Sequence, residues 1–439
     1  MSRTAVTNEP ETEERTSPRW QWRYWHWWLL ITGLVLRIGM TLLISREDSF
    51  AGWDGKEYYS YAQSLVAGHG DNYARISQVI RPPFYPLFLT PFAALTSHVW
   101  PIQVAQSVLG VVQSLILANI ALRWRNQRAG EAALVLALLN PFLIYYCSFI
   151  LTETLFISLL WLGILCLLLF SKPETQKPIK LLIIAGVVIG LACLTRPALQ
   201  PFLIVAALWI GWFSLRRANV LTALSHMAIF TLVVSVVILP MMLRNLRVRG
   251  DFSIAPYGTR LVVAMGNSPD YLRMYRAQTK ETYYQAQDQL HKKISLESPP
   301  EVLIREADDL RRNHPRDWLI LQLYKFRHFW TPWLNPLIFY RSQVVLSVVS
   351  ATPLFVFGLL ELWRHRRHFD PFLVLLIGLM GTGYLVGGLL FHVQVRYRIP
   401  FVDVSFLILT ATFLGQLKFA FLRQTLTDTF KLKRRIAHV

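Results

Sequence analysis

The sequence is poor in charge and in cysteine, and these shortages exclude several classes of protein. Charged residues make up only 16% of its 439 residues, less than a soluble protein of this length carries. The three cysteines, Cys147, Cys166 and Cys193, lie in apolar runs without a CxxC or Cys/His spacing, so neither a disulfide framework nor a zinc site is predicted. The formal net charge is +19, but the basic residues are not gathered in one soluble stretch, which argues against a nucleic-acid partner.

The sequence is instead dominated by long apolar runs. Hydrophobic residues make up 54% of the chain, and roughly 20 consecutive apolar residues cross a bilayer as a helix. Helices are the default because the backbone must pair within its own segment in lipid. The sequence therefore predicts an all-α polytopic membrane protein with about ten transmembrane helices. The expected spans are 27–45, 101–122, 131–148, 150–170, 180–195, 198–215, 221–243, 342–363, 371–391 and 399–418.

Basic residues occur in alternate gaps between these spans. If the spans alternate in direction, every basic gap falls on the same membrane face, and the positive-inside bias identifies that face as the cytoplasm. Both ends of the chain are then cytoplasmic, and the inner (plasma) membrane is the expected location. The residues that support this orientation are Arg15, Arg19, Arg23, Arg123, Arg125, Arg128, Lys172, Lys177, Lys180, Arg216, Arg217, Arg364, Arg366, Arg367, Lys431, Lys433, Arg434 and Arg435.

Five regions follow from this topology. Residues 1–26 form a polar cytoplasmic leader that is expected to be disordered, and no small-residue cleavage site follows the first apolar run, so a cleavable signal is not predicted. The other regions are a transmembrane module with the first outer loop, 27–243 with 46–100, a second outer region, 244–341, the last transmembrane helices, 342–418, and a basic cytoplasmic tail, 419–439.

Both outer regions are expected to carry helices next to the membrane. Within 54–68, apolar and aromatic residues share one face at helical spacing. Three prolines within 81–86 forbid a regular helix there, and the apolar stretch 84–96 is too short to span, so it is expected to lie in the interface or to re-enter. Residues 316–330 are amphipathic and are expected to lie along the membrane surface.

Two acidic residues close to the membrane on the outer side are candidates for chemistry. Asp54 follows the first span, and Glu153 begins the fourth. Ionisable groups at membrane depth are costly and are functional candidates by default. A structural explanation stays open for each, because Asp54 can cap a helix and Glu153 can be a favourable charge at a helix N-terminus.

Six arginines on the outer side run against the positive-inside trend and need a reason. A guanidinium binds phosphate oxygens bidentately, so several arginines around two carboxylates would suit a lipid-linked phosphate. The carboxylates would then serve as general base or as metal ligands. Arg37 can instead snorkel or pair with a carboxylate, and His392 can pack in the interface. The six are Arg37, Arg81, Arg196, Arg244, Arg396 and Arg398.

These residues occur in motifs that resemble the GT-C superfamily of membrane glycosyltransferases, in particular the bacterial, family 39-like branch related to protein O-mannosyltransferases. The resemblance covers most of residues 27–415, and it depends on the order and the outer-side placement of the motifs. The matching pieces are Arg37, Asp54-Gly55-x-x-Tyr58 with Ala62, Arg81-Pro82-Pro83-Phe84-Tyr85-Pro86, Tyr145-Tyr146, Thr152-Glu153, Gly190-Leu191-Ala192-x-Leu194-Thr195-Arg196-Pro197, Arg244-Asn245, Gly266-Asn267 and Arg396-Tyr397-Arg398-Ile399-Pro400.

The resemblance implies a GT-C fold and inverting transfer of a sugar from a polyprenyl-phosphate-linked donor to a lipid, glycan or protein acceptor. It assigns catalysis to Asp54 and Glu153, and it allows these two to hold a divalent cation, Mg²⁺ or Mn²⁺, with no other cofactor. Many relatives carry two adjacent acidic residues in the first loop. Here Gly55 follows Asp54 and the next acid is Glu57, which argues against a true protein mannosyltransferase.

The remaining site residues are also implied by this resemblance. Donor-phosphate binding falls to Arg37, Arg196, Arg244, Arg396 and Arg398, and the substrate pocket to Glu57, Tyr58, Arg81, Tyr85, Asn267 and His392.

A membrane transporter or flippase for a lipid-linked or anionic substrate is the main alternative. Transporters place polar residues at mid-membrane on broken helices and often show repeat symmetry. These spans are mostly clean and the polar residues cluster at the outer face, which favours an enzyme. A cell-wall polymerase or ligase of the same broad class and a non-catalytic assembly factor are further alternatives. The sequence does not specify the sugar, the acceptor or the oligomeric state.

Overall fold

The structure is a computed structural model that describes residues 20–45, 47–50, 53–69, 81–254, 258–294, 301–367 and 370–417. Most of the expected leader and the whole of the basic tail lie outside the described residues. The part that is described folds into helices and contains no strand. The prediction of an all-α polytopic fold is therefore confirmed for these ranges.

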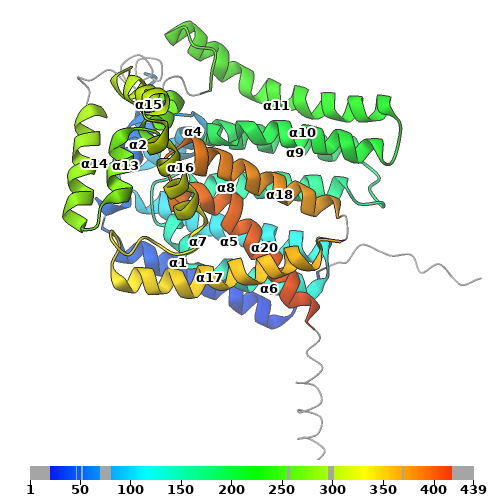
Figure 1. The fold of residues 1–439 in the computed structure, drawn as a ribbon. Coiled ribbons are helices and arrows are strands. Elements are labelled where there is room, and N and C mark those ends of the chain that lie inside the picture. Colours follow the sequence, from blue (N-terminus) through cyan, green and yellow to red (C-terminus); the bar gives the residue numbers. More distant parts are fainter. Residues whose placement is uncertain are drawn as a thin grey trace, which may run out of the picture.

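Nine helices in the described ranges are long and apolar enough to cross a membrane, and the number becomes ten when a bent pair counts as one span. They match the predicted spans one for one, and they lie roughly side by side in Figure 1. Their bounds are α1 (Tyr24–Leu43), α5 (Trp100–Trp124), α6 (Gln127–Leu139) with α7 (Pro141–Cys147), α8 (Glu153–Phe170), α9 (Pro178–Thr195), η2 (Pro197–Leu199) with α10 (Gln200–Leu215), α11 (Val220–Arg249), α17 (Arg341–Arg364), α18 (Pro371–Gly383) with η3 (Tyr384–Leu390), and α19 (Val395–Arg398) with η4 (Ile399–Asp403) and α20 (Val404–Gln416).

The bent pair is α6 and α7, which meet at an angle of 53°. Asn140 ends α6, and its side chain accepts hydrogen bonds from the first backbone N–H groups of α7. Pro141 begins α7, where a missing N–H costs nothing. The interruption leaves carbonyls at the end of α6 without helical partners, and the Arg37 guanidinium donates to those of Leu138 at 3.0 Å and Ala137 at 3.2 Å. Arg37 therefore stabilises a break in the third span.

Seven further helices gather at one end of the bundle, which we call the cap end (Figure 1). Tyr58, Tyr61 and Ala62 on α2 are buried, as the predicted shared face requires. Helix α16 runs across the bundle rather than along it, as expected for a helix on the membrane surface. The seven are α2 (Trp53–Val66), α4 (Phe84–Leu95), α12 (Gly258–Gly266), α13 (Pro269–Arg276), α14 (Lys280–Ile294), α15 (Glu301–Asn313) and α16 (Pro315–Trp330).

The opposite end of the bundle, which we call the basic end, holds the basic gaps between spans (Figure 1). There Arg125 after α5 meets His365 after α17 at 2.9 Å and Asp370 before α18 at 3.1 Å. The indole Nε1 of Trp124 donates to the same Asp370 carboxylate at 2.8 Å. These contacts bring distant basic gaps to one end, as the alternating topology predicts.

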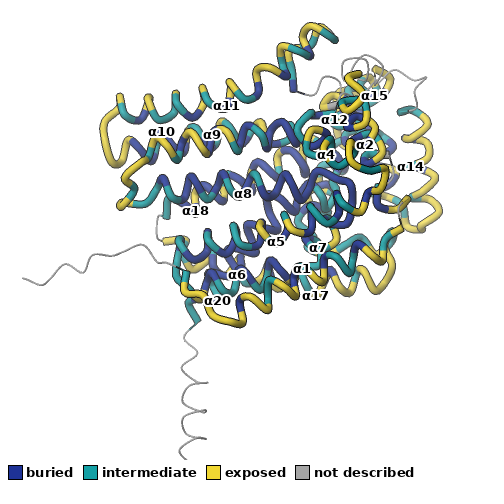
Figure 2. Tube along the Cα trace, turned by 180° about the vertical axis from the view of Figure 1, so that it is seen from behind, coloured by how far each residue is buried: buried dark blue, intermediate teal, exposed yellow. Residues whose placement is uncertain are grey.

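Burial divides the spans into inner and outer ones. Helices α8 and α20 are buried almost throughout, whereas α11 and α17 leave much of their length exposed (Figure 2). The exposed side chains on the outer spans are apolar, as with Leu232 and Val236 on α11. Such faces are expected to contact lipid, because a soluble protein would not expose contiguous apolar surface of this extent.

Candidate active site

Three segments far apart in the sequence meet at the cap end around Asp54. Asp54 is in the first turn of α2, Arg81 precedes α4 in the proline-rich segment, and Arg396 is on the four-residue helix α19. One oxygen of Asp54 accepts from Arg81 Nη2 at 2.7 Å, and the other lies 2.7 Å from Arg396 Nη1. Glu57, one turn along α2, accepts from Arg81 Nε at 2.5 Å. Both oxygens of Asp54 are therefore engaged by guanidiniums.

A second acidic residue lies beside this group. Glu153 begins α8 and is only 1% exposed, and its Oε1 accepts from Arg196 Nη1 at 3.2 Å. Arg196 follows the last residue of α9 and also donates to the backbone carbonyl of Arg396 at 3.4 Å. The other carboxylate oxygen of Glu153 has no hydrogen-bond partner among the described residues. The two acid–arginine pairs are thus joined through Arg396.

We call these six residues, Asp54, Glu57, Arg81, Glu153, Arg196 and Arg396, the charged cluster. It contains three carboxylates and three guanidiniums, so its formal charges cancel. Burial by itself would raise the pKa of the Asp54 carboxyl, but Arg396 and Arg81 hold it well below its usual range. Asp54 is therefore ionised at any physiological pH, and its lone pairs are directed at the two arginines.

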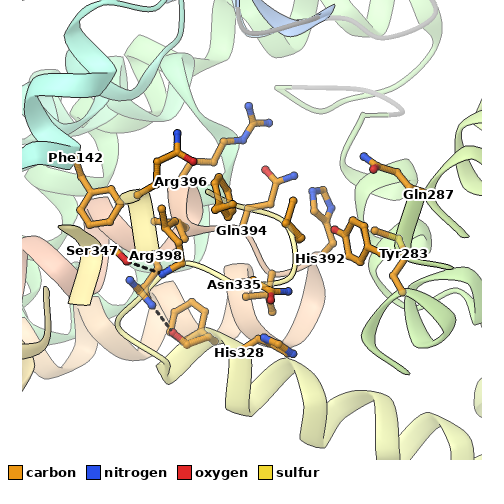
Figure 3. Close-up of a pocket in the computed structure, with 18 of the residues that line it drawn as sticks. Phe142, Tyr283, Gln287, His328, Asn335, Ser347, His392, Gln394, Arg396 and Arg398 are labelled. Atoms are coloured by element: carbon orange, nitrogen blue, oxygen red, sulfur yellow. Dashed lines mark hydrogen bonds between the residues drawn. The ribbon is translucent and has the colours of Figure 1, made fainter. Parts of the chain in front are cut away.

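A cavity of about 560 Å³ lies next to the charged cluster, between α7, α13, α14, α16, α17 and the segment before α19. Its wall is mainly aromatic and aliphatic, and Arg396 lies on its border. Figure 3 shows Arg396, Gln394 and His392 along one side of it. Apolar pockets with a few convergent polar groups are the usual form of small-molecule sites. Its aromatic residues are Phe142, Tyr145, Tyr146, Phe149, Tyr271, Tyr275, Tyr283, His291, His328, Phe329, Phe339 and His392.

His392 brings a neutral imidazole to this cavity. Its side chain is buried, its ring lies 5.3 Å from that of Tyr271 and 5.5 Å from that of Tyr397, and its Nδ1 has no hydrogen-bond partner among the described residues. Burial, Arg396 and Lys325 lower the pKa of His392 to about 3. The ring is therefore uncharged, and its Nδ1 can contact a ligand.

Asn267 holds the segment that leads to Arg396. Its Nδ2 donates to the carbonyl of Leu390 at 2.9 Å, and its Oδ1 accepts from Gln322 at 3.1 Å and from Lys325 at 3.3 Å. Lys325 Nζ also donates to the carbonyl of Leu389 at 2.5 Å. The preceding Gly266 touches the backbone of His392 so closely that a Cβ would have no room. The Asn267 side chain therefore connects helix α16 at the cap end to the segment 389–392.

Two of the other predicted pocket residues form the wall behind Arg81. The Arg81 guanidinium lies over the Tyr58 ring at 5.2 Å, and the Tyr58 and Tyr85 rings meet edge to face at 5.2 Å. The Tyr85 hydroxyl donates to Gln106 Oε1 at 2.8 Å. Both tyrosines are buried, so they support the cluster from behind.

Three arginines that were expected to bind phosphate lie outside the charged cluster, although Arg398 also lines the cavity. Arg398 uses all its nitrogens within the protein: it pairs with Asp403 at 2.7 Å and donates to the carbonyls of Phe329, Thr331 and Pro332. Arg37 lies on α1, and its guanidinium donates to the carbonyls at the end of α6. Arg244 lies on α11, which runs beyond the predicted end of the seventh span, and it reaches the Met241 sulfur at 4.0 Å. None of these three joins the Asp54–Arg396 contact.

The sequence interpretation missed Lys325 and Asp403. Lys325 lies one turn from both Leu321 and Phe329 on the buried face of α16, and burial lowers its pKa to about 7. A lysine at helical spacing between two apolar residues was the available signal. Asp403 lies five residues after Arg398, and the π-helical turn η4 between them brings the two side chains together.

The donor groups around Asp54 do not suit a divalent cation. Each oxygen of Asp54 faces a guanidinium, and one oxygen of Glu153 does too, so a cation there would lie among like charges. No group of three or more His, Cys, Asp or Glu side chains with metal-ligand geometry occurs in the described ranges. A second adjacent acid, which many relatives carry, has no space at Gly55, because a Cβ there would collide with the Phe50 carbonyl.

The chain is similar to known proteins in part of its sequence and in its fold. Residues 80–243 match the family model described as dolichyl-phosphate-mannose-protein mannosyltransferase. No curated protein matches the sequence. The fold is similar to that of the oligosaccharyltransferase AglB from Archaeoglobus fulgidus, with TM-score 0.50 and 15% identity in its complex with an inhibitory peptide and dolichol-phosphate, over 94% of this chain and 52% of AglB.

The apo form of the same archaeal enzyme gives a TM-score of 0.53 at 15% identity, again over 94% of this chain and 52% of the other. ArnT from Cupriavidus metallidurans bound to undecaprenyl phosphate gives 0.42 at 17% identity, over 89% of this chain and 77% of ArnT. This chain thus spans about half the length of AglB. The resemblance drawn from the motifs agrees with these matches: residues 80–243 match a glycosyltransferase family model, and the chain is a multi-spanning helical protein with a GT-C-like fold.

Proposed function

We propose that this protein is an inverting glycosyltransferase that moves a sugar from a polyprenyl-phosphate-linked donor to a lipid, glycan or protein acceptor. The observation that carries the proposal is the position of Arg396, which contacts Asp54 on one side and borders the 560 Å³ cavity on the other. A carboxylate that can accept a proton from an acceptor hydroxyl, a guanidinium that can bind a phosphate and an aromatic cavity that can receive a sugar therefore lie next to one another. The structure of AglB with dolichol-phosphate supports a lipid phosphate as ligand of this fold.

The cap end is the proposed extracytoplasmic side. The basic gaps between the described spans lie at the other end, and the positive-inside bias assigns that end to the cytoplasm. Both termini are then cytoplasmic, and the charged cluster faces the periplasm of an inner-membrane protein. Donor and acceptor would meet at the membrane surface, below the helices of the cap.

In the proposed reaction the oxygen of the acceptor hydroxyl attacks the anomeric carbon as the bond from that carbon to the phosphate oxygen breaks on the opposite face. The hydroxyl proton passes to Asp54, and the lipid phosphate leaves with the bonding electron pair. A positioned base contributes roughly 10²–10⁴-fold. The charge that develops on the leaving phosphate is stabilised by Arg396 and Arg196, which hold donors in place before the reaction. Arg398 has no free donor for this purpose.

The charged cluster has to rearrange for this reaction, because it is already neutral. A donor phosphate adds a negative charge, and the natural exchange is for Arg396 to leave Asp54 and bind the phosphate. Asp54 then loses one of the two counterions that depress its pKa, so its basicity increases when the donor is present. The expected order is donor first, then acceptor, and the free enzyme has a suppressed base.

Transfer of a labelled polyprenyl-phosphate sugar by the purified protein tests the proposal. Asp54→Asn should lower turnover about 10²–10⁴-fold. Asp48→Asn is the matched control, since Asp48 is an exposed aspartate shortly before α2 that accepts from Ser45 at 2.7 Å and lies outside the charged cluster. Near-normal turnover in Asp54→Asn would exclude Asp54 as the general base. Movement of label across the bilayer without a covalent product would support the transporter alternative instead.

A divalent cation bound by Asp54 and Glu153 is a separate question that the same assay answers. We expect activity to persist after treatment with EDTA, because arginines already supply the positive charge around both carboxylates. Loss of activity with EDTA and recovery with Mg²⁺ or Mn²⁺ would assign these carboxylates to a metal.

A further inference from the structure

A second cavity lies at the basic end, far from the charged cluster. It has a volume of about 470 Å³ and is formed by the end of α5, the turn after α8 and the start of α9. Four of its lining side chains are cationic and one is acidic. They are Arg123, Lys172, Lys177 and Lys180 with Glu174, together with Leu169, Thr175, Gln176, Leu181 and Ile184.

The other basic gaps at this end hold cations that have partners. Arg125 pairs with Asp370 at 3.1 Å, and Arg364 lies 3.9 Å from Glu361. Arg217 stacks over a ring of α10, 4.4 Å from the Phe213 centroid, and Arg366 stacks over Trp363 at 3.9 Å. A positive-inside bias alone accounts for these residues, since each is stabilised within the protein.

The cavity differs because its positive charge is not balanced. Glu174 is the one carboxylate among the lining residues, against four cations. Burial lowers the pKa of the Lys172 ammonium, and the nearby carboxylates of Glu174 and Asp370 do not offset this effect. An anion placed in the cavity would remove this unfavourable electrostatic energy.

The backbone around the cavity is fixed and adds to its attraction for an anion. The Thr175 hydroxyl donates to the carbonyl of Leu169 at 2.5 Å, and the Ser171 hydroxyl to that of Leu168 at 2.7 Å, so the turn after α8 is tied to the helix end. Helix α9 starts at Pro178, and no side chain caps its N-terminus. The first N–H groups of a helix have no partners within it and favour negative charge.

The cavity continues into an apolar surface on α9. Leu181 and Ile184 line its inner side. Ile183 and Val187 are 42% and 37% exposed, and they lie on the same face of α9 as Lys180 at helical spacing. A ligand that fits therefore has an anionic group at one end and a long apolar part beyond it.

We propose that this cavity binds the phosphate head group of an anionic phospholipid, with an acyl chain along the exposed face of α9. Basic pockets between transmembrane helices on the cytoplasmic side are suited to such head groups. The site would anchor the bundle in the leaflet opposite the charged cluster. It is independent of the sugar-transfer reaction.

Binding can be measured on the full-length purified protein by native mass spectrometry and thermal unfolding. The probes are dioleoylphosphatidylglycerol, dioleoylphosphatidylcholine and inorganic phosphate. We expect bound phosphatidylglycerol and a raised Tm with that lipid alone. Each neutralised cation should weaken the binding about fivefold, so Lys177→Gln with Lys180→Gln should reduce it about 25-fold. Both side chains are exposed, so the double variant is expected to fold.

The matched control is Arg216→Gln with Arg217→Gln, which removes the same charge from another gap at the basic end. It should bind phosphatidylglycerol like the unaltered protein. Equal weakening in both double variants would overturn the proposal, because the lipid would then respond to surface charge in general. Equal binding of phosphatidylcholine, or equal stabilisation by inorganic phosphate, would overturn it as well.

Discussion

Arg396 and Arg398 are two residues apart on α19 and both line the cavity, yet their side chains have different partners. Each pairs with an aspartate at 2.7 Å. The Arg396–Asp54 pair is 24% exposed on both side chains, borders the cavity and includes a guanidinium nitrogen, Nε, without a partner among the described residues. The Arg398 side chain is 2% exposed and has no such nitrogen. Figure 3 shows the two side chains leaving the segment in different directions.

The difference teaches how to interpret an arginine motif near a membrane. A guanidinium whose donors are all used by backbone carbonyls and a buried carboxylate, as in Arg398, fixes the fold, because its hydrogen bonds are directed and saturated. A guanidinium that shares a carboxylate with another arginine and retains an unpartnered nitrogen can exchange partners. Arg37 resembles Arg398 in that its two Nη atoms donate to the backbone carbonyls of Gly33, Ala137 and Leu138. The motif Arg396-Tyr397-Arg398 therefore combines one residue of each kind.

Neutralising Arg398 should have the largest effect, on folding. Arg398→Gln leaves the Asp403 carboxylate buried without its counterion, and breaking a buried pair in this way costs about 3–5 kcal/mol. The expected result is little folded protein in detergent, measured by size-exclusion chromatography and thermal unfolding. A variant that folds with an unchanged Tm would show that the distinction between the two arginines is wrong.

Neutralising Arg396 should mainly affect catalysis. Arg396→Gln should lower kcat about 10²–10³-fold, the usual loss when one stabilising donor is removed, and should leave Tm nearly unchanged. It also removes one of the two arginines that depress the pKa of Asp54, so this pKa should rise. The acid limb of kcat/KM against pH should then move to higher pH. If the acid limb does not move, the ionisation seen in the pH profile is not that of Asp54.

Removing the Asn267 contacts with the segment before α19 tests whether they position Arg396. Asn267→Ala leaves the Leu390 carbonyl and the donors of Gln322 and Lys325 short of a partner, which should cost about 1–3 kcal/mol of stability. We expect kcat to fall while KM for the acceptor changes less. Asn313→Ala on the exposed face of α15 is the control and should change neither quantity. Full activity in Asn267→Ala would mean that the cap does not position Arg396.

The smallest effect concerns pH and Lys325. Its pKa is about 7 in the fold, below the ordinary 10.5, so the unfolded chain binds an extra proton between these values. Stability should therefore rise with pH from about 7 towards 10.5, by at most about 1.4 kcal/mol per pH unit. A neutral amine still has donors for Leu389 and Asn267. Tm measured from pH 6 to 9 should rise in the unaltered protein relative to Lys325→Met, and parallel curves would contradict the assignment.

Hydropathy carried enough information for the spans, because each needs a long apolar run that no other fold tolerates. All ten were predictable from it, including the third span, although its break at Asn140 was not. The order of the motifs also led to the GT-C-like fold, and residues 80–243 match a glycosyltransferase family model. Those motifs made candidates of Asp54, Glu57, Arg81 and Arg396, and the fold does bring these four side chains together.

The pairing of side chains could not be predicted, because it depends on tertiary contacts between separate segments or on the local geometry of an irregular turn. Nothing in the sequence says that Arg37 would meet the end of α6, or that the π-helical turn η4 would place Asp403 beside Arg398. Lys325 was hidden for a related reason. Its helix is amphipathic, and a lysine there is normally assigned to the polar face until its neighbours on the next turn are compared.

The early end of α6 has a consequence for the cavity. Because the third span stops at Leu139 and resumes in a new direction, Pro141 and Phe142 at the start of α7 form part of the cavity wall where a straight helix would have continued. Room for a ligand is therefore obtained beside α7 without removing a helix from the bundle. Under the proposed function, the helices around the cavity would keep bulk water away from the bound donor, and this would protect its glycosyl group from hydrolysis until an acceptor binds.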